Sequence, residues 1–337
     1  MRTEKYSRQI LFSPIGLEGQ EKIMAGKVVI VGCGALGTAQ AAMLARAGVG
    51  KLRIVDRDYV EESNLQRQLL FEESDAAERL PKAVAAERRL RLANSDVQVE
   101  GLVADLESRN AEELLRGFDV ILDGTDNFET RYLLNDVSVK LGVPWIYGAV
   151  VGSYAATLTV IPGLTPCIAC VFPEPPSGVQ ETCDTAGVIA PAAAWAASVQ
   201  TTEALKILMG HEDDLHGSLL AYDIWNGTLQ RIKPRRNPDC PACVNHRFDY
   251  LNASTPTAVS LCGRDAYQIH PAHTRSLDLQ ALKSQLDGLG TLRGNDYLVH
   301  FQLDGREITV FKDGRAIVKG VEDAAAARGL YACYVGA

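Results

Sequence analysis

The sequence lacks any apolar run long enough to cross a membrane. A membrane-spanning helix needs about 20 consecutive apolar residues, and the alanine-rich stretch over residues 190–210 is interrupted by Gln200, Glu203 and Lys206. The first thirty residues carry charges throughout and contain no apolar core of a signal peptide. These absences predict a cytoplasmic protein that has no membrane partner.

The sequence also lacks an excess of basic residues, because 42 Asp and Glu residues outnumber 34 Lys and Arg residues and give a formal net charge of -8. A protein whose main task is to bind nucleic acid usually carries a basic surface, so we expect no nucleic-acid partner. Histidine is absent before position 211. The amino-terminal part of the chain therefore offers no imidazole for hydride chemistry, although a lysine could take that role.

Short apolar segments alternate with helix-compatible segments over the first 160 residues. Residues 27–31 form a short apolar run that is followed by a glycine, a helix-compatible stretch comes next, and residues 51–56 form a second strand-like segment that ends at Asp56. Continuous runs of this length are typical of strands buried on both faces of a parallel sheet. The alternation predicts an α/β fold with a doubly wound, largely parallel, Rossmann-like sheet.

The pattern changes near residue 249. A polar segment rich in Asn, Ser, Thr and Pro occupies residues 249–262, which is typical of a linker. Beyond it, a helix-like stretch precedes short strands that are joined by the turns Asp304-Gly305 and Asp313-Gly314. We therefore predict a nucleotide-binding α/β domain over residues 1–248, a linker over 249–265 and a small α+β domain over 266–337.

A glycine-rich loop lies between the first predicted strand and the helix that follows it. Gly32, Gly34 and Gly37 have the G-x-G-x-x-G spacing. Glycines at these positions allow a tight turn and a close approach of the backbone to phosphate at the start of the helix. Asp56 ends the next predicted strand, where its carboxylate can accept hydrogen bonds from ribose hydroxyls. This combination predicts a nucleotide site.

Polar residues that follow Asp56 in the sequence help to identify the type of nucleotide. Asn64, Arg67 and Lys82 follow the second strand, and Asp126 follows a later strand that ends with Asp-Gly. The carboxyl ends of parallel strands meet at the ligand crevice of this fold. Two cations and a carboxylate suit a triphosphate with Mg²⁺ better than a dinucleotide. A NAD(P)-dependent oxidoreductase remains the alternative at this point.

The cysteines fall into two groups. Cys167 and Cys170 form one Cys-x-x-Cys pair, and Cys240 and Cys243 form another. Four thiolates in two such pairs predict a structural tetrahedral Zn²⁺ site, with four unligated cysteines or a redox pair as the alternatives. Cys183 stands alone in a polar segment flanked by glycine, and it is either a reactive thiol or a residue without a chemical role.

Several segments together make the chain similar to the ThiF/MoeB family, the bacterial relatives of ubiquitin-activating enzymes. The matching segments are residues 6–10, 32–37, 56–68, 81–82, 123–131, 167–170, 182–187 and 240–243. The resemblance covers residues 1–248 and implies that they form an ATP-binding adenylation domain. It implies that the protein is an adenylyltransferase of the C-terminal glycine carboxylate of a ubiquitin-like sulfur carrier, in thiamine or molybdopterin synthesis.

The resemblance also implies roles for individual residues. Asp56 would bind ribose, Asn64, Arg67 and Lys82 would bind and polarise the triphosphate, and Asp126 would hold Mg²⁺. Arg8 resembles an arginine that reaches into the partner protomer's site, which implies a homodimer. Cys183 matches a cysteine that bonds covalently to the carrier in ThiF-like members and is dispensable in MoeB-like members.

Residues beyond 248 carry no convincing rhodanese loop, because the segment Cys262-Gly263-Arg264-Asp265 does not have its pattern. We therefore expect a separate sulfur donor protein. Two alternatives to a carrier adenylyltransferase stay open from the sequence, the NAD(P)-dependent oxidoreductase and a non-catalytic carrier-binding scaffold. A relative that adenylates a tRNA base is disfavoured by the acidic composition.

Overall fold

The computed structural model describes residues 4–175, 185–254, 258–261, 266–271 and 276–336. The chain divides into two compact units, one of Met1–Glu73 with Pro81–Ala253 and one of Ser74–Leu80 with Ser254–Ala337. The predicted domain boundaries stay a prediction. Within the predicted linker, Ala258–Leu261 forms strand β9, which pairs with β10 (Ala266–Ile269). The polar composition of the preceding residues gave no indication of this short strand.

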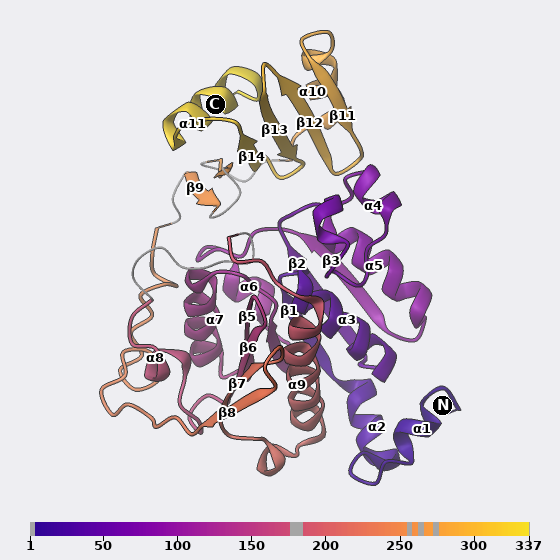
Figure 1. The fold of residues 1–337 in the computed structure, drawn as a ribbon, viewed down its shortest axis with the longest axis vertical. Coiled ribbons are helices and arrows are strands. Elements are labelled where there is room, and N and C mark those ends of the chain that lie inside the picture. Colours follow the sequence, from indigo (N-terminus) through magenta and orange to yellow (C-terminus); the bar gives the residue numbers. More distant parts are fainter. Residues whose placement is uncertain (1–3, 176–184, 255–257, 262–265, 272–275, 337) are drawn as a thin grey trace. The chain divides into compact units, whose positions relative to one another are not determined.

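An eight-stranded sheet forms the centre of the first unit (Figure 1). The strand order is β3-β2-β1-β4-β5-β6-β7-β8; the first five strands are parallel, and β6, β7 and β8 are antiparallel. This confirms the predicted doubly wound, largely parallel sheet. The strands are β1 (Lys27–Val31), β2 (Lys51–Asp56), β3 (Gln98–Val103), β4 (Val120–Asp123), β5 (Trp145–Val151), β6 (Tyr154–Val160), β7 (Leu219–Asp223) and β8 (Thr228–Ile232).

Helices cover both faces of this sheet (Figure 1). Apolar side chains of α3 and α9 pack together with β5 and β6 on one face, and those of α6 and α7 pack against β1 and β4 on the other. The helices of this unit are η1 (Glu4–Tyr6), α1 (Ser7–Ile10), α2 (Gly16–Ala25), α3 (Ala35–Ala47), η2 (Glu62–Asn64), α5 (Lys82–Ala93), α6 (Ala111–Leu115), α7 (Phe128–Leu141), α8 (Ile168–Val171), α9 (Ala190–Met209) and η3 (Glu212–Asp214).

The alanine-rich segment over residues 190–210 forms the core helix α9. Pro191 stands in its first turn, where the missing N–H costs no hydrogen bond, and Gly210 ends it with a φ of 77°. Gln200 and Glu203 are buried, and both side chains form hydrogen bonds with neighbouring segments. Among the residues that the structure describes, no helix combines the length and apolar character needed to cross a membrane.

The strand order places the polar ends of three strands next to one another. β1 lies between β2 and β4, and both neighbours run parallel to it. The chain builds the sheet outwards from β1 in one direction through β2 and β3, and then in the opposite direction through β4 and β5. The carboxyl end of β1 is therefore the topological switch point, where open α/β sheets bind ligands. The glycine loop follows β1, Asp56 ends β2 and Asp123 ends β4.

The second unit is built on a six-stranded antiparallel sheet with the order β11-β12-β13-β14-β10-β9. Asp304 and Gly305 join β12 to β13 with φ values of 51° and 76°, as a two-residue type I′ hairpin turn requires. This confirms the predicted α+β character. The remaining elements are α4 (Glu73–Ala77), of which residues 74–77 belong to this unit, α10 (Leu279–Leu286), β11 (Thr291–Gly294), β12 (Leu298–Leu303), β13 (Arg306–Phe311), β14 (Ala316–Lys319) and α11 (Ala324–Tyr334).

A buried carboxylate on α7 holds the chain that follows the second cysteine pair. Asp136 is 3% exposed, and one of its oxygens, Oδ2, accepts hydrogen bonds from Tyr250 N (2.9 Å) and Leu251 N (3.2 Å). The Tyr132 and Tyr250 rings stack with centroids 4.8 Å apart. Burial raises the pKa of Asp136 to about 6, although both backbone hydrogen bonds oppose the shift.

This shift predicts that Asp136→Asn changes how stability depends on pH. The folded-state pKa lies above the unfolded value of about 3.9, so the stabilising contribution is complete below pH ~4 and is lost as the pH rises through 6. An amide oxygen can still accept both N–H groups, but it carries no charge. We compare the melting temperature of the variant with that of wild type at each pH. This difference should be ~2–4 °C more positive at pH 8 than at pH 5.

Asp213→Asn is the matched control, because Asp213 is an exposed carboxylate on η3 in the same unit. Its difference from wild type should stay within about 1 °C between the two pH values. Equal pH dependence of Asp136→Asn and wild type would contradict the raised pKa.

Candidate nucleotide site and cysteine cluster

Two positions of the glycine loop have no room for a side chain. Gly32 has a φ of 88°, and a Cβ there would lie 2.5 Å from Gly124 O. Gly37 lies in the first turn of α3, where a Cβ would lie 1.9 Å from Gly32 O. The loop therefore packs tightly between the start of α3 and the end of β4. The first amides of α3 have no helical partners, so they can bind the phosphates of a nucleotide.

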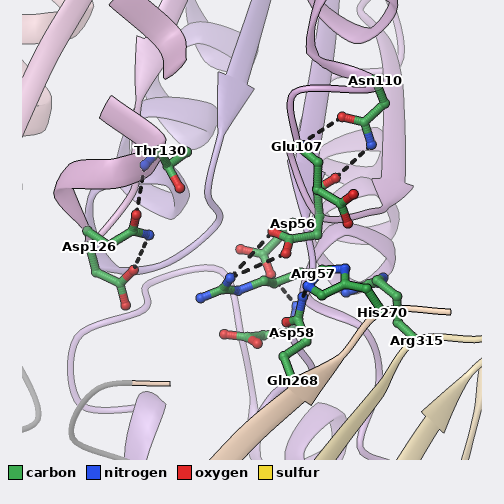
Figure 2. Close-up of polar contacts among 12 residues, drawn as sticks. Asp56, Arg57, Asp58, Glu107, Asn110, Asp126, Thr130, Gln268, His270 and Arg315 are labelled. Carbon is green, nitrogen blue, oxygen red and sulfur yellow. Dashed lines mark hydrogen bonds and ion pairs between the residues drawn. The ribbon is translucent and has the colours of Figure 1, made fainter. Parts of the chain in front are cut away.

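Asp56 supports the glycine loop from the end of β2. Its side chain is 8% exposed; Oδ2 accepts from Cys33 N (2.5 Å), and Oδ1 accepts from Asp58 N (2.7 Å). Burial raises the pKa of Asp56, and the positive charge of Lys82 opposes this shift. A carboxylate can accept about four hydrogen bonds, so each oxygen can also accept a ribose hydroxyl. Figure 2 shows Asp56, Arg57 and Asp58 in sequence at this strand end.

Lys82 places a cation close to these carboxylates. It is the first residue of α5, its side chain is 4% exposed, and its Nζ lies 3.4 Å from Asp58 Oδ2. A backbone hydrogen bond from Lys82 N to Asp58 O (2.9 Å) fixes the start of the helix to the same loop. The sequence singled out Lys82 but not Asp58. The signal was available, because Asp58 stands two residues after Asp56.

Asn64 and Arg67 lie on the turn between Asp58 and Lys82. Asn64 is 2% exposed, and its Oδ1 accepts from Glu61 N at 3.1 Å. Arg67 Nη1 donates to Ser63 O at 2.7 Å, and its side chain is half-buried. The side chain of Asn64 therefore stabilises the local turn in this structure. The roles of Asn64 and Arg67 towards a triphosphate stay predictions.

Asp126 lies on the loop between β4 and α7, and its side chain is exposed (Figure 2). The next residue, Asn127, is the N-cap of α7; its Oδ1 accepts from Thr130 N at 2.8 Å, and its Nδ2 donates to Asp126 Oδ1 at 3.4 Å. The carboxylate thus stands at the same sheet edge as the glycine loop, on a backbone that the helix cap fixes. An exposed carboxylate there can contribute one oxygen ligand to a metal bound by phosphates.

The four paired cysteines meet, as the spacing predicts. The sulfur atoms of Cys167 and Cys240 are 3.6 Å apart, those of Cys170 and Cys243 are 3.5 Å apart, and those of Cys167 and Cys170 are 3.9 Å apart. All four thiols are free, and their sulfur atoms lie within 4.8 Å of one another. A hydrogen bond from Cys167 lowers the pKa of Cys170 to about 4. The cluster can therefore bind a metal ion.

Two predicted residues are not tested by this geometry. Arg8 is exposed on α1, and the role that the resemblance implies for it lies in a partner protomer. Cys183 lies outside the described residues. From Thr185 onwards the residues are described again, and Gly152 forms backbone hydrogen bonds with Gly187 O (2.8 Å) and Ile189 N (3.1 Å).

Comparisons with known proteins agree with the sequence and the fold. The ThiF family model matches residues 6–242. The sulfur carrier protein ThiS adenylyltransferase of Bacillus subtilis is 47% identical over 338 residues, which cover 99% of this chain and 100% of that protein. The sulfur carrier protein adenylyltransferase of Thermus thermophilus is 42% identical over 246 residues, or 71% of this chain and 90% of that protein.

A solved structure of E. coli MccB superimposes on this chain with a TM-score of 0.63 at 23% identity. The superposition covers 72% of this chain and 75% of that chain. At this identity the likeness concerns the fold, and it matches the mostly parallel α/β architecture described above.

Proposed function

The chain belongs to the ThiF family, and we propose that it uses ATP to adenylate the C-terminal glycine carboxylate of a ubiquitin-like sulfur carrier. The carrier would serve sulfur transfer in thiamine or molybdopterin synthesis. Relatives that match most or all of the chain are named as adenylyltransferases of sulfur carriers. The structural observation that carries the proposal is the buried Lys82 beside Asp56 and the glycine loop.

The proposed reaction needs positioning and charge neutralisation more than a protein nucleophile. The carrier carboxylate attacks the α-phosphorus of ATP, the bond to the β-phosphate oxygen breaks, and pyrophosphate leaves. Negative charge accumulates on the phosphates during this displacement, so fixed cations lower the barrier. In our proposal Lys82 and Arg67 supply that charge, Asn64 binds the triphosphate, the glycine-loop amides hold phosphate oxygens and Asp56 orients the ribose.

Asp126 would hold Mg²⁺. Magnesium is usually bound through one or two carboxylates together with substrate phosphates, and the exposed carboxylate of Asp126 fits this requirement. When bound, the ion would neutralise charge on the phosphate oxygens.

The cysteine cluster fits Zn²⁺. Four sulfur atoms placed 2.3 Å from a tetrahedral zinc ion lie about 3.8 Å from one another. Three of the sulfur pairs here are 3.5–3.9 Å apart, and all four atoms lie within 4.8 Å of one another. A site with four thiolate ligands has no open position for substrate, so we propose a structural role. A reducing compartment keeps such thiols available for metal, and we place the protein in the cytoplasm for this reason.

Partners complete the proposal. We propose a homodimer in which Arg8 reaches the partner protomer's nucleotide, and a separate protein as the sulfur donor. Cys183 would bond covalently to the activated carrier if the protein follows the ThiF-like members. The Bacillus subtilis relative, which matches over the whole length, is named for the carrier ThiS, and this favours a ThiS-like partner.

Pyrophosphate exchange tests the proposed function. The protein, a ThiS-like carrier, Mg²⁺ and ATP should exchange labelled pyrophosphate into ATP, because adenylation is reversible while the acyl-adenylate stays bound. A carrier that lacks its final glycine should support no exchange and serves as the control. Absence of exchange with every ThiS-like and MoaD-like carrier, together with thermal stabilisation by NADH but not by Mg-ATP, would favour the oxidoreductase instead.

A further inference from the structure

A buried ion pair lies directly behind the loop that carries Asp126. Arg131, on the first turns of α7, places its Nε 3.2 Å from Oδ2 of Asp123, the last residue of β4. The two side chains are 6% and 0% exposed. A buried pair of this kind costs desolvation energy and is weak grounds for stability by itself. Its hydrogen bonds to surrounding segments indicate another role.

Both oxygens of Asp123 and the Nη2 atom of Arg131 form hydrogen bonds with two neighbouring segments of the chain. Asp123 Oδ1 accepts from the amide (2.9 Å) and the hydroxyl (2.7 Å) of Thr125, and Oδ2 also accepts from Gly148 N (3.2 Å). Arg131 Nη2 donates to Thr125 O (2.8 Å) and Gly148 O (3.0 Å). The pair therefore binds both the N–H and the C=O of Thr125 and of Gly148.

Aromatic rings restrict the guanidinium further. The Arg131 Cζ atom lies 5.3 Å from the ring centroid of Phe128 and 5.4 Å from that of Tyr147. A planar guanidinium can stack on rings and donate several hydrogen bonds in fixed directions, whereas an ammonium group cannot. The geometry thus depends on arginine rather than on positive charge alone.

These contacts fix the backbone on both sides of Asp126. Thr125 precedes it and is held by the ion pair, while Asn127 follows it and caps α7. One residue earlier, Gly124 packs against Gly32 of the glycine loop so closely that a Cβ on Gly32 would meet Gly124 O at 2.5 Å. The position of Asp126 relative to the phosphate-binding loop is therefore set by this local network.

We propose that Arg131 is a positioning residue, which acts through Asp123 and Thr125 to hold the Asp126 carboxylate at the place where it contributes to metal and phosphate binding. This inference rests on the proposed function of Asp126. It assigns to the buried pair a role in nucleotide chemistry beyond its contribution to packing. Arg131 itself is directed into the interior and would touch neither the nucleotide nor the carrier.

Charge balance explains why an arginine stands behind Asp123. Burial raises the pKa of Asp123, and the Arg131 guanidinium is the largest influence that opposes this shift. A protonated Asp123 would lose acceptor capacity towards Thr125 and Gly148. Arg131 therefore favours the carboxylate form, which can accept hydrogen bonds from both backbone segments.

Amide hydrogen exchange tests the positioning role without ligand. Arg131→Lys retains a charge beside Asp123 but cannot make all the bonds from Nη2, so peptides spanning residues 124–130 should exchange ~10-fold faster than in wild type. Arg53→Lys is the matched control, because Arg53 also bonds a carboxylate (Glu100), a backbone carbonyl (Leu114 O, 2.8 Å) and lies 4.8 Å from an aromatic centroid (Phe118). It should leave exchange at 124–130 unchanged.

Manganese binding gives the second measurement. With a non-hydrolysable ATP analogue, the affinity for Mn²⁺, measured by electron paramagnetic resonance, should fall ~10-fold in Arg131→Lys and remain at the wild-type value in Arg53→Lys. Excess metal should restore most of the pyrophosphate exchange rate in Arg131→Lys. Thr125→Val removes one hydrogen bond to Asp123 without leaving a charge unpaired. It should change amide exchange and Mn²⁺ affinity in the same direction as Arg131→Lys, and it replaces that variant as the test if Arg131→Lys folds poorly.

The outcomes separate this inference from the proposed function. If Asp126→Asn binds Mn²⁺ and exchanges pyrophosphate as wild type does, the role of Asp126 is wrong, whatever Arg131 does. If Asp126→Asn is impaired while Arg131→Lys and Thr125→Val match Arg53→Lys in amide exchange and Mn²⁺ affinity, the positioning role is overturned and the proposed function stands.

Discussion

Replacing Lys82 by methionine is expected to lower the carrier-dependent pyrophosphate exchange rate by ~10²–10³-fold, the usual effect of removing one fixed group that stabilises transition-state charge. The side chain is 4% exposed and close to two carboxylates, so the cation is held in place before the nucleotide arrives. Such preorganised charge acts without the reorganisation that water would need. The measurement is the exchange rate at saturating ATP and carrier.

Loss of Lys82 also removes the cation that lies 3.4 Å from Asp58, and taking away one member of a charge pair with little solvent exposure destabilises a protein. The double variant Lys82→Met/Asp58→Asn separates the two effects, because it removes both charges together. Its melting temperature should recover towards the wild-type value while its exchange rate stays low. Lys51→Met is a control, because Lys51 also pairs with a carboxylate, Glu100. Lys51 begins β2, whereas Asp56 ends it, so Lys51 lies at the end of the strand away from the nucleotide site. Near-normal exchange by a folded Lys82 variant would remove Lys82 from the site.

The parts of the fold and the site that follow local rules could be predicted from the sequence. The apolar run of β1, the glycine turn and α3 form one continuous segment, so the loop and Asp56 could be located from pattern alone. Lys82 was located through the family resemblance and through its position after the second strand. The spacing of the cysteine pairs is typical of residues that bind one metal ion together, and their sulfur atoms lie close together as predicted.

The parts that were missed depend on segments that meet only in the folded chain. The partner of Lys82 is Asp58, and the partners of Asp123 are Thr125, Arg131 and Gly148. No local periodicity indicates that an arginine on α7 will bind the backbone of both a loop and β5. Strand β9 was missed for a different reason, because a polar neighbourhood was interpreted as linker throughout.

The antiparallel strands show why the cysteine cluster matters for the first unit. β6, β7 and β8 extend the parallel sheet at one edge, and all five residues of β8 are exposed. The second cysteine pair follows β8, and the first pair follows β6. A metal bound by both pairs would therefore tie the chain that leaves the exposed edge strand to the chain that leaves β6, across a long separation in sequence.

Removing the metal from the cysteine cluster is accordingly expected to lower the melting temperature by at least ~10 °C. Structural zinc contributes about 10–16 kcal/mol of binding free energy, which is comparable to the whole stability of about 5–15 kcal/mol of a typical protein. Wild type should contain one zinc ion per chain by elemental analysis. A strong chelator should lower the melting temperature, and added Zn²⁺ should restore it. Cys240→Ser should bind no zinc and melt near the chelated wild type.

Two comparisons decide whether zinc or simple packing accounts for that result. Cys240 is fully buried, so a serine hydroxyl without a partner would destabilise the protein by ~1–3 kcal/mol even in the absence of any metal site. The chelator acts on the unaltered chain and avoids this ambiguity. Cys333→Ser changes an exposed thiol in the second unit and should alter neither zinc content nor melting temperature. A metal-free wild type that melts at the same temperature with and without added Zn²⁺ would leave the four thiols as ordinary core residues.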